Sequence, residues 1–181
     1  DLHSFPTRRS SDLLVHAFFQ CRSLPSIVIP DSVTNIGDEA FRDCDCLTNI
    51  DIPDSVASIG NLTFGFCKSL TSVSIGSGLN SIGTNAFKDC NSSLSVIVSQ
   101  ENTKFDSRDN CNAIIDTERN TVILGCKNTF IPNGVTVIGR DSFYGCSGLS
   151  SIKIPDGVTL IGDNAFYGCN GLTSVTIPKS V

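Results

Sequence analysis

The sequence predicts a β-rich α/β solenoid in which short repeats stack around a parallel sheet. The first observation is a five-residue motif, Ala-Phe-Arg-Asp-Cys at residues 40–44, that recurs in varied form along the chain. The second is its period, because Phe18, Phe41, Phe64 and Phe87 are each 23 residues apart. A fixed period of roughly 20–50 residues indicates a repeat architecture, whose units bury a continuous core only by stacking on one another.

Each unit divides into two extended pieces and a turn segment, as residues 38–60 illustrate. Residues 47–52 end in alternation of apolar and polar positions, which indicates a short strand. Residues 53–55 (Pro-Asp-Ser) indicate a turn, because proline fixes φ and has no N–H for a ladder. Residues 56–59 form a second extended piece, which Gly60 ends. Stacking would place equivalent apolar residues in two ladders: Leu47, Leu70, Leu149 and Leu172; Ile50, Val73, Ile152 and Val175.

A one-turn helix is expected after the glycine of each unit. Residues with side chains suited to N-capping follow most of these glycines, namely Asp38, Asn61, Thr84 and Asp163. Such side chains accept hydrogen bonds from the unpaired N–H groups at a helix start. Arg140 departs from this pattern, and Asp141 is expected to serve in its place. The helical turn would carry the phenylalanine inward.

The period breaks once, because Phe87 and Phe143 are 56 residues apart. We place an irregular insertion at about residues 99–129. Two apolar runs flank a polar stretch there, which predicts a hairpin centred between Glu118 and Arg119. This register makes three facing pairs: Ile115 with Val122, Ala113 with Leu124, and Cys111 with Cys126. A disulfide between the two cysteines is left open, because facing residues approach closely enough for one.

Residues 1–13 resemble the translation of a short-read sequencing adapter. Such segments are excluded from fold reasoning, so we expect residues 1–13 to add nothing to the repeat core. The alternative is a basic N-terminal tail with a proline turn. The repeat array is placed at residues 14–181, and we expect the chain to be an internal fragment of a longer open reading frame.

The full repeat reads Ala-Phe-x-x-Cys-x-x-Leu-x-x-Ile-x-Ile-Pro-x-x-Val-x-x-Ile-Gly across residues 14–181. This motif resembles the BspA-like (Treponema pallidum-type) leucine-rich repeats, and a long variant unit also resembles that family. The resemblance implies a leucine-rich-repeat solenoid with a parallel sheet. Because that family includes adhesins and other surface proteins, it also implies a secreted or cell-surface location, which the residues of this fragment do not themselves specify.

The cysteines are expected to be buried thiols that pack as small hydrophobic side chains. The chain has nine, of which six occupy one repeat position: Cys21, Cys44, Cys67, Cys90, Cys146 and Cys169. A disulfide ladder or a metal site are the alternatives. Pairing would break the repeat symmetry, and zinc needs four ligands, usually with Cys-x-x-Cys spacing. We therefore predict no metal and no cofactor.

No catalytic constellation is apparent, so we expect the chain not to be an enzyme. His16 is the only histidine outside residues 1–13 and is expected at the surface. The oxygen-rich run at residues 106–110 lacks the glycine and distal glutamate of a calcium loop. A net charge of −5 without a basic stripe argues against nucleic acid as a partner. No apolar run approaches the roughly 18 residues that predict insertion into a membrane.

The best candidate for a binding surface is the outward face of the predicted sheet. Its members form a hydroxyl-rich, weakly charged strip: Thr48, Asn49, Asp51, Thr71, Ser72, Ser74, Ser150, Ser151, Lys153, Thr173, Ser174 and Thr176. Solenoids use such extended surfaces for binding. The alternative is that serine and threonine merely suit exposed strands.

We therefore expect a non-catalytic module that binds protein or glycan on the exposed sheet face, as part of a secreted or cell-surface protein, with adhesion as one such role. One alternative is an intracellular protein-interaction scaffold. Another is the targeting region of an enzyme whose catalytic domain lies outside this fragment.

Overall fold

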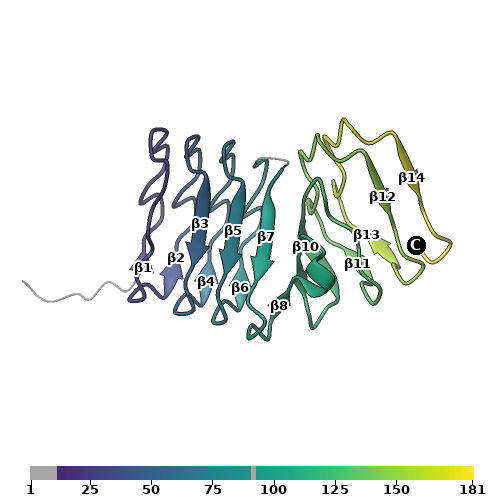
Figure 1. The fold of residues 1–181 in the computed structure, drawn as a ribbon, viewed down its shortest axis with the longest axis horizontal. Helices are drawn as coiled ribbons and strands as arrows, with labels where there is room; N and C mark the ends of the chain where they lie inside the picture. The colour runs from purple at the N-terminus through teal and green to yellow at the C-terminus, as the bar shows by residue number, and fades with distance from the viewer. Residues whose placement is uncertain (1–11, 91–92) are drawn as a thin grey trace, which may run out of the picture.

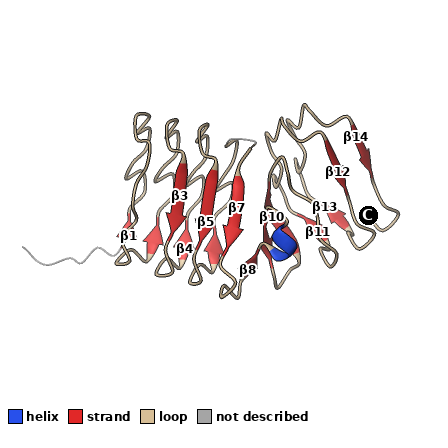
Figure 2. Ribbon diagram, in the orientation of Figure 1, coloured by secondary structure: helices blue, strands red, loops and turns tan. Residues whose placement is uncertain are grey.

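The computed structural model describes residues 12–90 and 93–181. The chain winds into an elongated solenoid whose successive turns lie side by side from the N-terminal to the C-terminal end (Figure 1). Strands and turns make up the described residues almost entirely, and one 3₁₀ turn, η1 (Arg108–Asn110), is the helical element among them (Figure 2). The predicted leucine-rich-repeat solenoid with parallel sheets is confirmed.

The first stack has a parallel sheet of four-residue strands. These are β3 (Asn49–Ile52), β5 (Ser72–Ile75) and β7 (Ser95–Val98), in that order. Neighbouring strands align equivalent repeat positions, so that Ile50 pairs with Val73. Side chains alternate between the core and solvent along each strand, as expected for a sheet with one buried face.

The second extended piece of each unit forms a second parallel sheet. Its two-residue strands are β1 (Asp12–Leu13), β2 (Asn35–Ile36), β4 (Ser58–Ile59) and β6 (Ser81–Ile82), in that order. The two sheets enclose the core of the stack between them.

The N-terminal boundary of the array differs from the expectation. Asp12 pairs with Asn35 and Leu13 with Ile36, one full repeat away. Leu13 is partly buried and packs against the core of the first stack. The prediction that residues 1–13 add nothing to the repeat core is therefore wrong for Leu13, while its larger part, residues 1–11, lies outside the described residues.

The segment after each glycine is a series of turns, so the expected one-turn helix does not form. Glu39 and Asp43 have left-handed backbone angles, with φ of 55° and 58°. The N–H of Phe41 points along the solenoid and donates to the carbonyl of Thr63, in the next repeat, at 2.8 Å. An α-helix would direct that N–H to a carbonyl four residues back in its own segment. A ladder between repeats therefore replaces the helix.

The predicted capping residues serve this ladder. Asp38 Oδ1 accepts a hydrogen bond from the N–H of Asn61 at 2.7 Å, and Asn61 Oδ1 accepts one from Thr84 at 2.8 Å. Each side chain thus satisfies a donor of the following repeat instead of a helix start in its own. The expectation that Asp141 replaces Arg140 as a cap is wrong, because Asp141 Oδ1 has no hydrogen-bond partner within the described part of the chain.

The insertion contains the predicted hairpin. Its antiparallel strands are β9 (Ala113–Asp116) and β10 (Thr121–Gly125), and β8 (Phe105–Asp106) pairs antiparallel with β9. The predicted pairing of Ile115 with Val122 is confirmed. Ala113 faces Gly125 instead of Leu124, because an irregularity between Val122 and Leu124 shifts the register. An unpaired residue of this kind is a β-bulge, which the apolar pattern alone does not reveal.

Cys111 and Cys126 are buried and both carry free thiols, so the disulfide left open by the hairpin register is not formed. Beyond the strands the backbone takes other partners. The N–H of Phe130 donates to the carbonyl of Cys111 at 3.3 Å, and the N–H of Cys126 donates to Thr129 Oγ1 at 2.7 Å.

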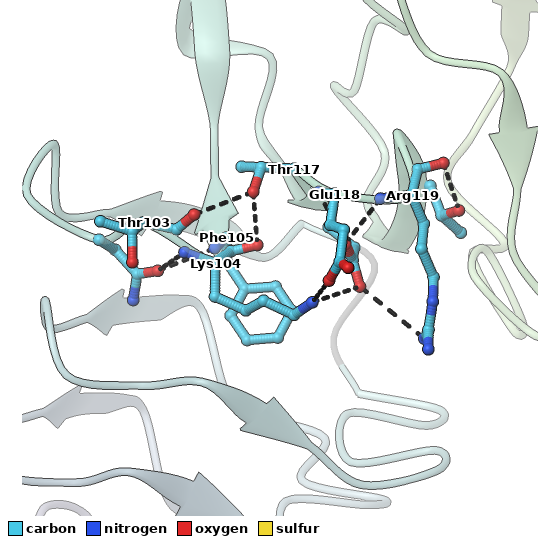
Figure 3. A network of polar contacts seen from close by, with 9 residues as sticks. Thr103, Lys104, Phe105, Thr117, Glu118 and Arg119 are labelled. Carbon is cyan, nitrogen blue, oxygen red and sulfur yellow. Dashed lines mark hydrogen bonds and ion pairs between the residues drawn. The ribbon is translucent and has the colours of Figure 1, made fainter.

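Polar contacts that involve Lys104, Thr117, Glu118 and Arg119 lie at the tip of the hairpin (Figure 3). The residue that several of them share is Asp116. Its side chain is only 4% exposed, and its Oδ1 accepts hydrogen bonds from the N–H groups of Glu118 and Arg119, both at 3.0 Å. Lys104 Nζ ion-pairs with Asp116 at 3.7 Å and with Glu118 at 2.5 Å. Thr117 Oγ1 donates to the carbonyl of Lys104, which fastens the tip to the preceding chain.

The second stack begins on the hairpin. β10 pairs in parallel with β11 (Val137–Ile138), which pairs in parallel with β13 (Leu160–Ile161). The opposite sheet consists of β12 (Ser151–Lys153) and β14 (Ser174–Thr176), also parallel. The insertion therefore supplies the first strand of the second stack.

Stacked aromatic rings run through the core. The ring centroids of Phe41 and Phe64 are 5.3 Å apart with an interplanar angle of 5°, and the ladder includes Phe18 and Phe87. The predicted inward position of the phenylalanine is confirmed, since Phe41 and Phe64 are 0% exposed. Phe143 and Phe166 stack in the same way in the second stack, at 5.1 Å.

Candidate binding surface

The structure places the predicted strip residues on the outward faces of two sheets. Eleven of the twelve are exposed, and Ser74 is half-buried. Six belong to β3, β5 and the residues just before them, and the other six to β12, β14 and the residues just before those. Their outward orientation in β3, β5 and β12 follows from the alternation along these strands, in which Ile50 and Ile52 face the core, whereas all three residues of β14 are exposed.

The strip is not continuous, because the two sheets that carry it are separate. β7 extends the first half with Ser95 and Ile97, which align with Ser72 and Ser74. Ile97 is 63% exposed. The sequence interpretation missed both residues. Allowing for the one extra residue in 91–94 would have found them.

The insertion closes the edge of β7 with side chains. Asn112 Oδ1 accepts a hydrogen bond from the N–H of Val96 at 2.7 Å, and Asn112 Nδ2 donates to the carbonyl of Leu94 at 3.0 Å. Ser107 Oγ accepts from the N–H of Val98 at 3.1 Å. These groups replace the backbone of a further strand, so the first half of the strip ends at β7.

Some of the predicted hydroxyls hold the solenoid together. Thr71 Oγ1 donates to the carbonyl of Thr48 at 3.0 Å, and Thr173 Oγ1 donates to that of Ser150 at 3.3 Å. The carbonyl of Pro25 accepts the equivalent bond from Thr48 Oγ1. These threonines therefore have a structural role in addition to any role in binding.

A hollow of about 640 Å³ adjoins the second half of the strip. Lys153 lines it from β12, Asp109 lines it from the insertion, and Phe130 lines it from the residues that directly follow the insertion. Phe130 is 48% exposed, so part of its ring is open to solvent beside the hollow. The insertion thus brings a carboxylate, and the resumed repeat an aromatic ring, beside the predicted Ser151 and Lys153, a combination that the sequence analysis did not identify.

The six repeated cysteines are free thiols, and four of them are buried as expected, whereas Cys21 and Cys90 are half-buried. Cys67 Sγ donates to the carbonyl of Phe41 at 3.1 Å, and Cys90 Sγ donates to that of Phe64 at 3.0 Å. Burial raises the pKa of Cys44 to about 11 and that of Cys90 to about 12. Because the thiolate is the nucleophile and the metal ligand, these thiols are poorly suited to either chemistry at neutral pH.

The remaining candidates lie apart from the strip. The side chain of His16 is 56% exposed, as predicted, and its Nε2 is 3.3 Å from Glu39 Oε2. In the run at residues 106–110, Arg108 Nη2 is 2.8 Å from Asp106 Oδ2, so an internal cation pairs with the carboxylate. Within the described residues, no helix has the length and apolar character to cross a bilayer.

Comparisons with known proteins agree with this architecture. The family model for the BspA type leucine-rich repeat region matches residues 10–114 and 123–181, with six copies. The fold is similar to that of the pneumococcal vaccine antigen PcpA, with a TM-score of 0.77 and 23% identity over 88% of this chain and 40% of that one.

Two further solved structures are similar. A leucine-rich cell surface protein from Faecalibacterium prausnitzii gives a TM-score of 0.61 and 25% identity, over 92% of this chain and 58% of that one. A leucine-rich repeat protein from T. pallidum gives a TM-score of 0.55 and 28% identity, over 93% of this chain and 64% of that one. The chain thus spans less than two thirds of each of these proteins. A search of the curated proteins finds no match. The repeats and the stacked parallel sheets agree with the family match, and the chain belongs to the BspA-type leucine-rich repeat family.

Proposed function

We propose that the chain is a non-catalytic module that binds a protein or glycan ligand, as part of a secreted or cell-surface protein with a role such as adhesion. The observation that carries this proposal is the hollow beside β12, where Phe130, Lys153 and Asp109 converge on the exposed sheet face. An aromatic ring supplies a large apolar contact area and a lysine supplies a charged hydrogen-bond donor, and repeat solenoids use such extended surfaces for binding.

The location rests on similarity. The F. prausnitzii protein with a similar structure is described as a cell surface protein, and PcpA as a vaccine antigen. The absence of catalysis is proposed from the chemistry of the described residues, in which the ladder cysteines are held as neutral thiols and the one described histidine, His16, lies at the surface next to Glu39.

The test screens the purified chain against an array of glycans and an array of purified extracellular proteins. For a ligand so found, Lys153→Glu and Phe130→Ala should each weaken binding by about tenfold or more, as substitutions at hot spots do. Lys127→Glu and Phe19→Ala are matched controls, because both residues are exposed and lie outside the strip and the hollow. Loss of binding in the controls alone, or no ligand on either array, would contradict the proposal.

A further inference from the structure

A second candidate site lies where the two stacks meet. A cleft of about 300 Å³ separates the turn segment of the last regular unit of the first stack, residues 83–88, from the first turn segment of the second stack, residues 139–144. Its floor includes Thr121, Ile123 and Leu124 of β10. Its volume is at the lower end of the range for small-molecule sites. This cleft is separate from the strip and from the hollow beside β12.

The cleft exists because the turn segment at this junction is shorter than in an intact unit. In an intact unit, the carbonyl of Ile59 accepts a hydrogen bond from the N–H of Gly83. Five residues later, the N–H of Phe64 donates to the carbonyl of Ala86. At the junction, the carbonyl of Val122 accepts a hydrogen bond from the N–H of Gly139 in the same way. The next N–H that donates to the second stack belongs to Gly125, only three residues later, and its acceptor is the carbonyl of Ser142. Two residues of the turn segment are therefore missing.

The missing residues correspond to Asn61 and Leu62 of the intact unit. The peptide group that joins those two residues bridges three repeats. Its carbonyl accepts from the N–H of Glu39 at 2.8 Å, and its N–H donates to the carbonyl of Thr84 at 3.1 Å. One secondary amide, with its two hydrogen bonds, is thus absent at the junction.

Both partners of that absent amide are unpaired. Asn85 is equivalent to Glu39, and its N–H has no acceptor among the described residues. Arg140 is equivalent to Thr84, and its carbonyl has no donor among those residues. The N–H of Phe87, one ladder position further, also lacks an acceptor in the described chain. Asn85 is half-buried and Arg140 is exposed, so these backbone groups are open to hydrogen bonding by a ligand.

Two buried side chains of the cleft wall each carry one atom without a hydrogen-bond partner among the described residues, although Asp141 also ion-pairs through Oδ2 with Arg140 Nε at 3.4 Å. The side chain of Asp141 is only 5% exposed, and Ser142 is 1% exposed. Asp141 Oδ1 and Ser142 Oγ have no hydrogen-bond partner in the part of the chain that the structure describes. At the position of Ser142, Thr63 Oγ1 in an intact unit donates to the carbonyl of Gly60 at 2.8 Å. Both side chains therefore have free hydrogen-bonding capacity at the cleft.

We propose that this cleft binds the acetamido group of an N-acetylated sugar. The acetamido carbonyl accepts from the N–H of Asn85, and the acetamido N–H donates to the carbonyl of Arg140. The methyl group packs on the apolar floor of Ile82, Ile123 and Leu124, and sugar hydroxyls donate to Asp141 Oδ1 and Ser142 Oγ.

The neighbouring ladder positions favour a pendant amide over a peptide strand. The carbonyl of Val122 and the N–H of Gly125 already occupy the ladder positions on either side of the gap. A peptide running along the ladder would have to displace them. An acetamido group projects from its ring and can enter from solvent, and carboxylate and hydroxyl groups are suited to sugar hydroxyls.

The first measurement is amide hydrogen exchange by NMR on the unliganded chain. Leu62 and Phe64 are matched controls, because they occupy the same ladder positions as Asn85 and Phe87 but donate to Thr84 and Ala86. Asn85 and Phe87 should exchange at least about tenfold faster than these controls, since exchange protection follows hydrogen bonding and burial. Equal protection would mean that the cleft is closed, and would overturn the proposal.

The second measurement is titration of the ¹⁵N-labelled chain with N-acetylglucosamine. The amide signals of Asn85 and Phe87 should shift saturably, while glucosamine and methyl glucoside, which lack the acetyl group, should bind at least tenfold more weakly. Asp141→Asn should weaken binding, and Asp163→Asn, an exposed aspartate of the next repeat outside the cleft, should not.

A third titration uses N-acetylglycine methylamide, a peptide-like compound that carries the acetamido group without a sugar ring. It tests whether the cleft prefers the amide of a sugar or that of a peptide. Weaker binding than that of N-acetylglucosamine supports the sugar assignment, and equal or tighter binding overturns it. Absence of a saturable shift with N-acetylglucosamine overturns the whole proposal, and leaves the binding proposed for the strip unaffected because the two sites share no residue.

Discussion

The thiol of Cys67 donates a hydrogen bond to the carbonyl of Phe41, 26 residues earlier, at 3.1 Å. The same bond joins Cys44 to Phe18, Cys90 to Phe64 and, in the second stack, Cys169 to Phe143. Each cysteine thus links its own turn to the phenylalanine of the preceding repeat. This bond requires the protonated thiol, because a thiolate has no hydrogen to donate.

The first prediction is that alkaline pH weakens the fold through these thiols. Burial raises the pKa of Cys44 and of Cys146 from a usual value of 9.0 to about 11. Between pH 9 and 11 the unfolded chain therefore binds fewer protons at these groups than the folded chain, and the free energy of unfolding falls as pH rises. The stabilisation is fully present below pH 9 and is lost as pH passes through about 11.

Urea denaturation at several pH values measures this effect. Other groups titrate in the same range, so the comparison is between the wild-type chain and Cys44→Ala. The variant should start less stable at pH 8, and the difference between the two chains should narrow as pH rises to 11. A difference that is independent of pH would contradict the role assigned to the Cys44 thiol.

The second prediction concerns the aromatic ladder. Phe64 is 0% exposed and stacks between Phe41 and Phe87. Phe64→Ala should cost about 3–5 kcal/mol, because it removes buried apolar surface and leaves a cavity. Ser72→Ala is the control on the exposed face of β5 and should change stability by at most about 0.5 kcal/mol. Similar urea midpoints for the two variants would refute the assignment of inward and outward faces.

The sequence predicted most of what depends on a constant period. Phe41, Cys44 and Leu47 recur every 23 residues, and all three are completely buried. The turn segment was misjudged, because local propensity suggested a helix at Asp38. The N–H groups there donate to carbonyls of the next repeat, as the N–H of Phe41 does to the carbonyl of Thr63. Such bonds depend on stacking, which a single unit does not encode locally.

The candidate sites were harder to predict where the period fails. Phe130 lies one 23-residue period before Lys153, but Asp109 reaches the same hollow from within the insertion, whose folding the period does not describe. The bulge between Val122 and Leu124 changes which residues face each other without changing the apolar pattern. The unpaired amide of Asn85 results from two missing turn residues, and this deletion is visible only once the ladder of the intact units is known.

The third prediction concerns Asn102, which is 7% exposed and lies at the C-terminal boundary of the first stack. Its Nδ2 donates to the carbonyls of Gly76 and Leu79, at 2.8 and 2.9 Å. Its Oδ1 accepts from the N–H groups of Lys104 and Phe105, at 2.9 and 2.8 Å. One side chain therefore satisfies four backbone groups where the next regular repeat is lacking.

Asn102→Ala should destabilise the chain by about 3 kcal/mol or more, since each buried group left unpaired costs about 1–3 kcal/mol. Asn80→Ala is the control, because Asn80 is exposed and belongs to the same stack. Chemical denaturation of both variants measures the difference. If Asn102→Ala is as stable as Asn80→Ala, the four hydrogen bonds do not maintain this boundary.

The last prediction concerns Gly125, where the hairpin meets the second stack. A Cβ atom there would clash with Cε1 of Phe143, a ring that is only 1% exposed. The ring is held in place by its stacking on Phe166, so it has little room to move. Gly125→Ala should destabilise the chain by about 1–3 kcal/mol, as overpacking of a core does.

Gly157→Ala is the matched control, because the atom nearest to a new Cβ at Gly157 is the carbonyl oxygen of Val135, at an ordinary 3.6 Å. Thermal and urea denaturation should separate the two variants, and Phe143→Leu should restore part of the stability lost in Gly125→Ala by removing the clash. Equal stability of the two glycine variants, or no rescue by Phe143→Leu, would show that the hairpin does not pack on the second stack through this contact.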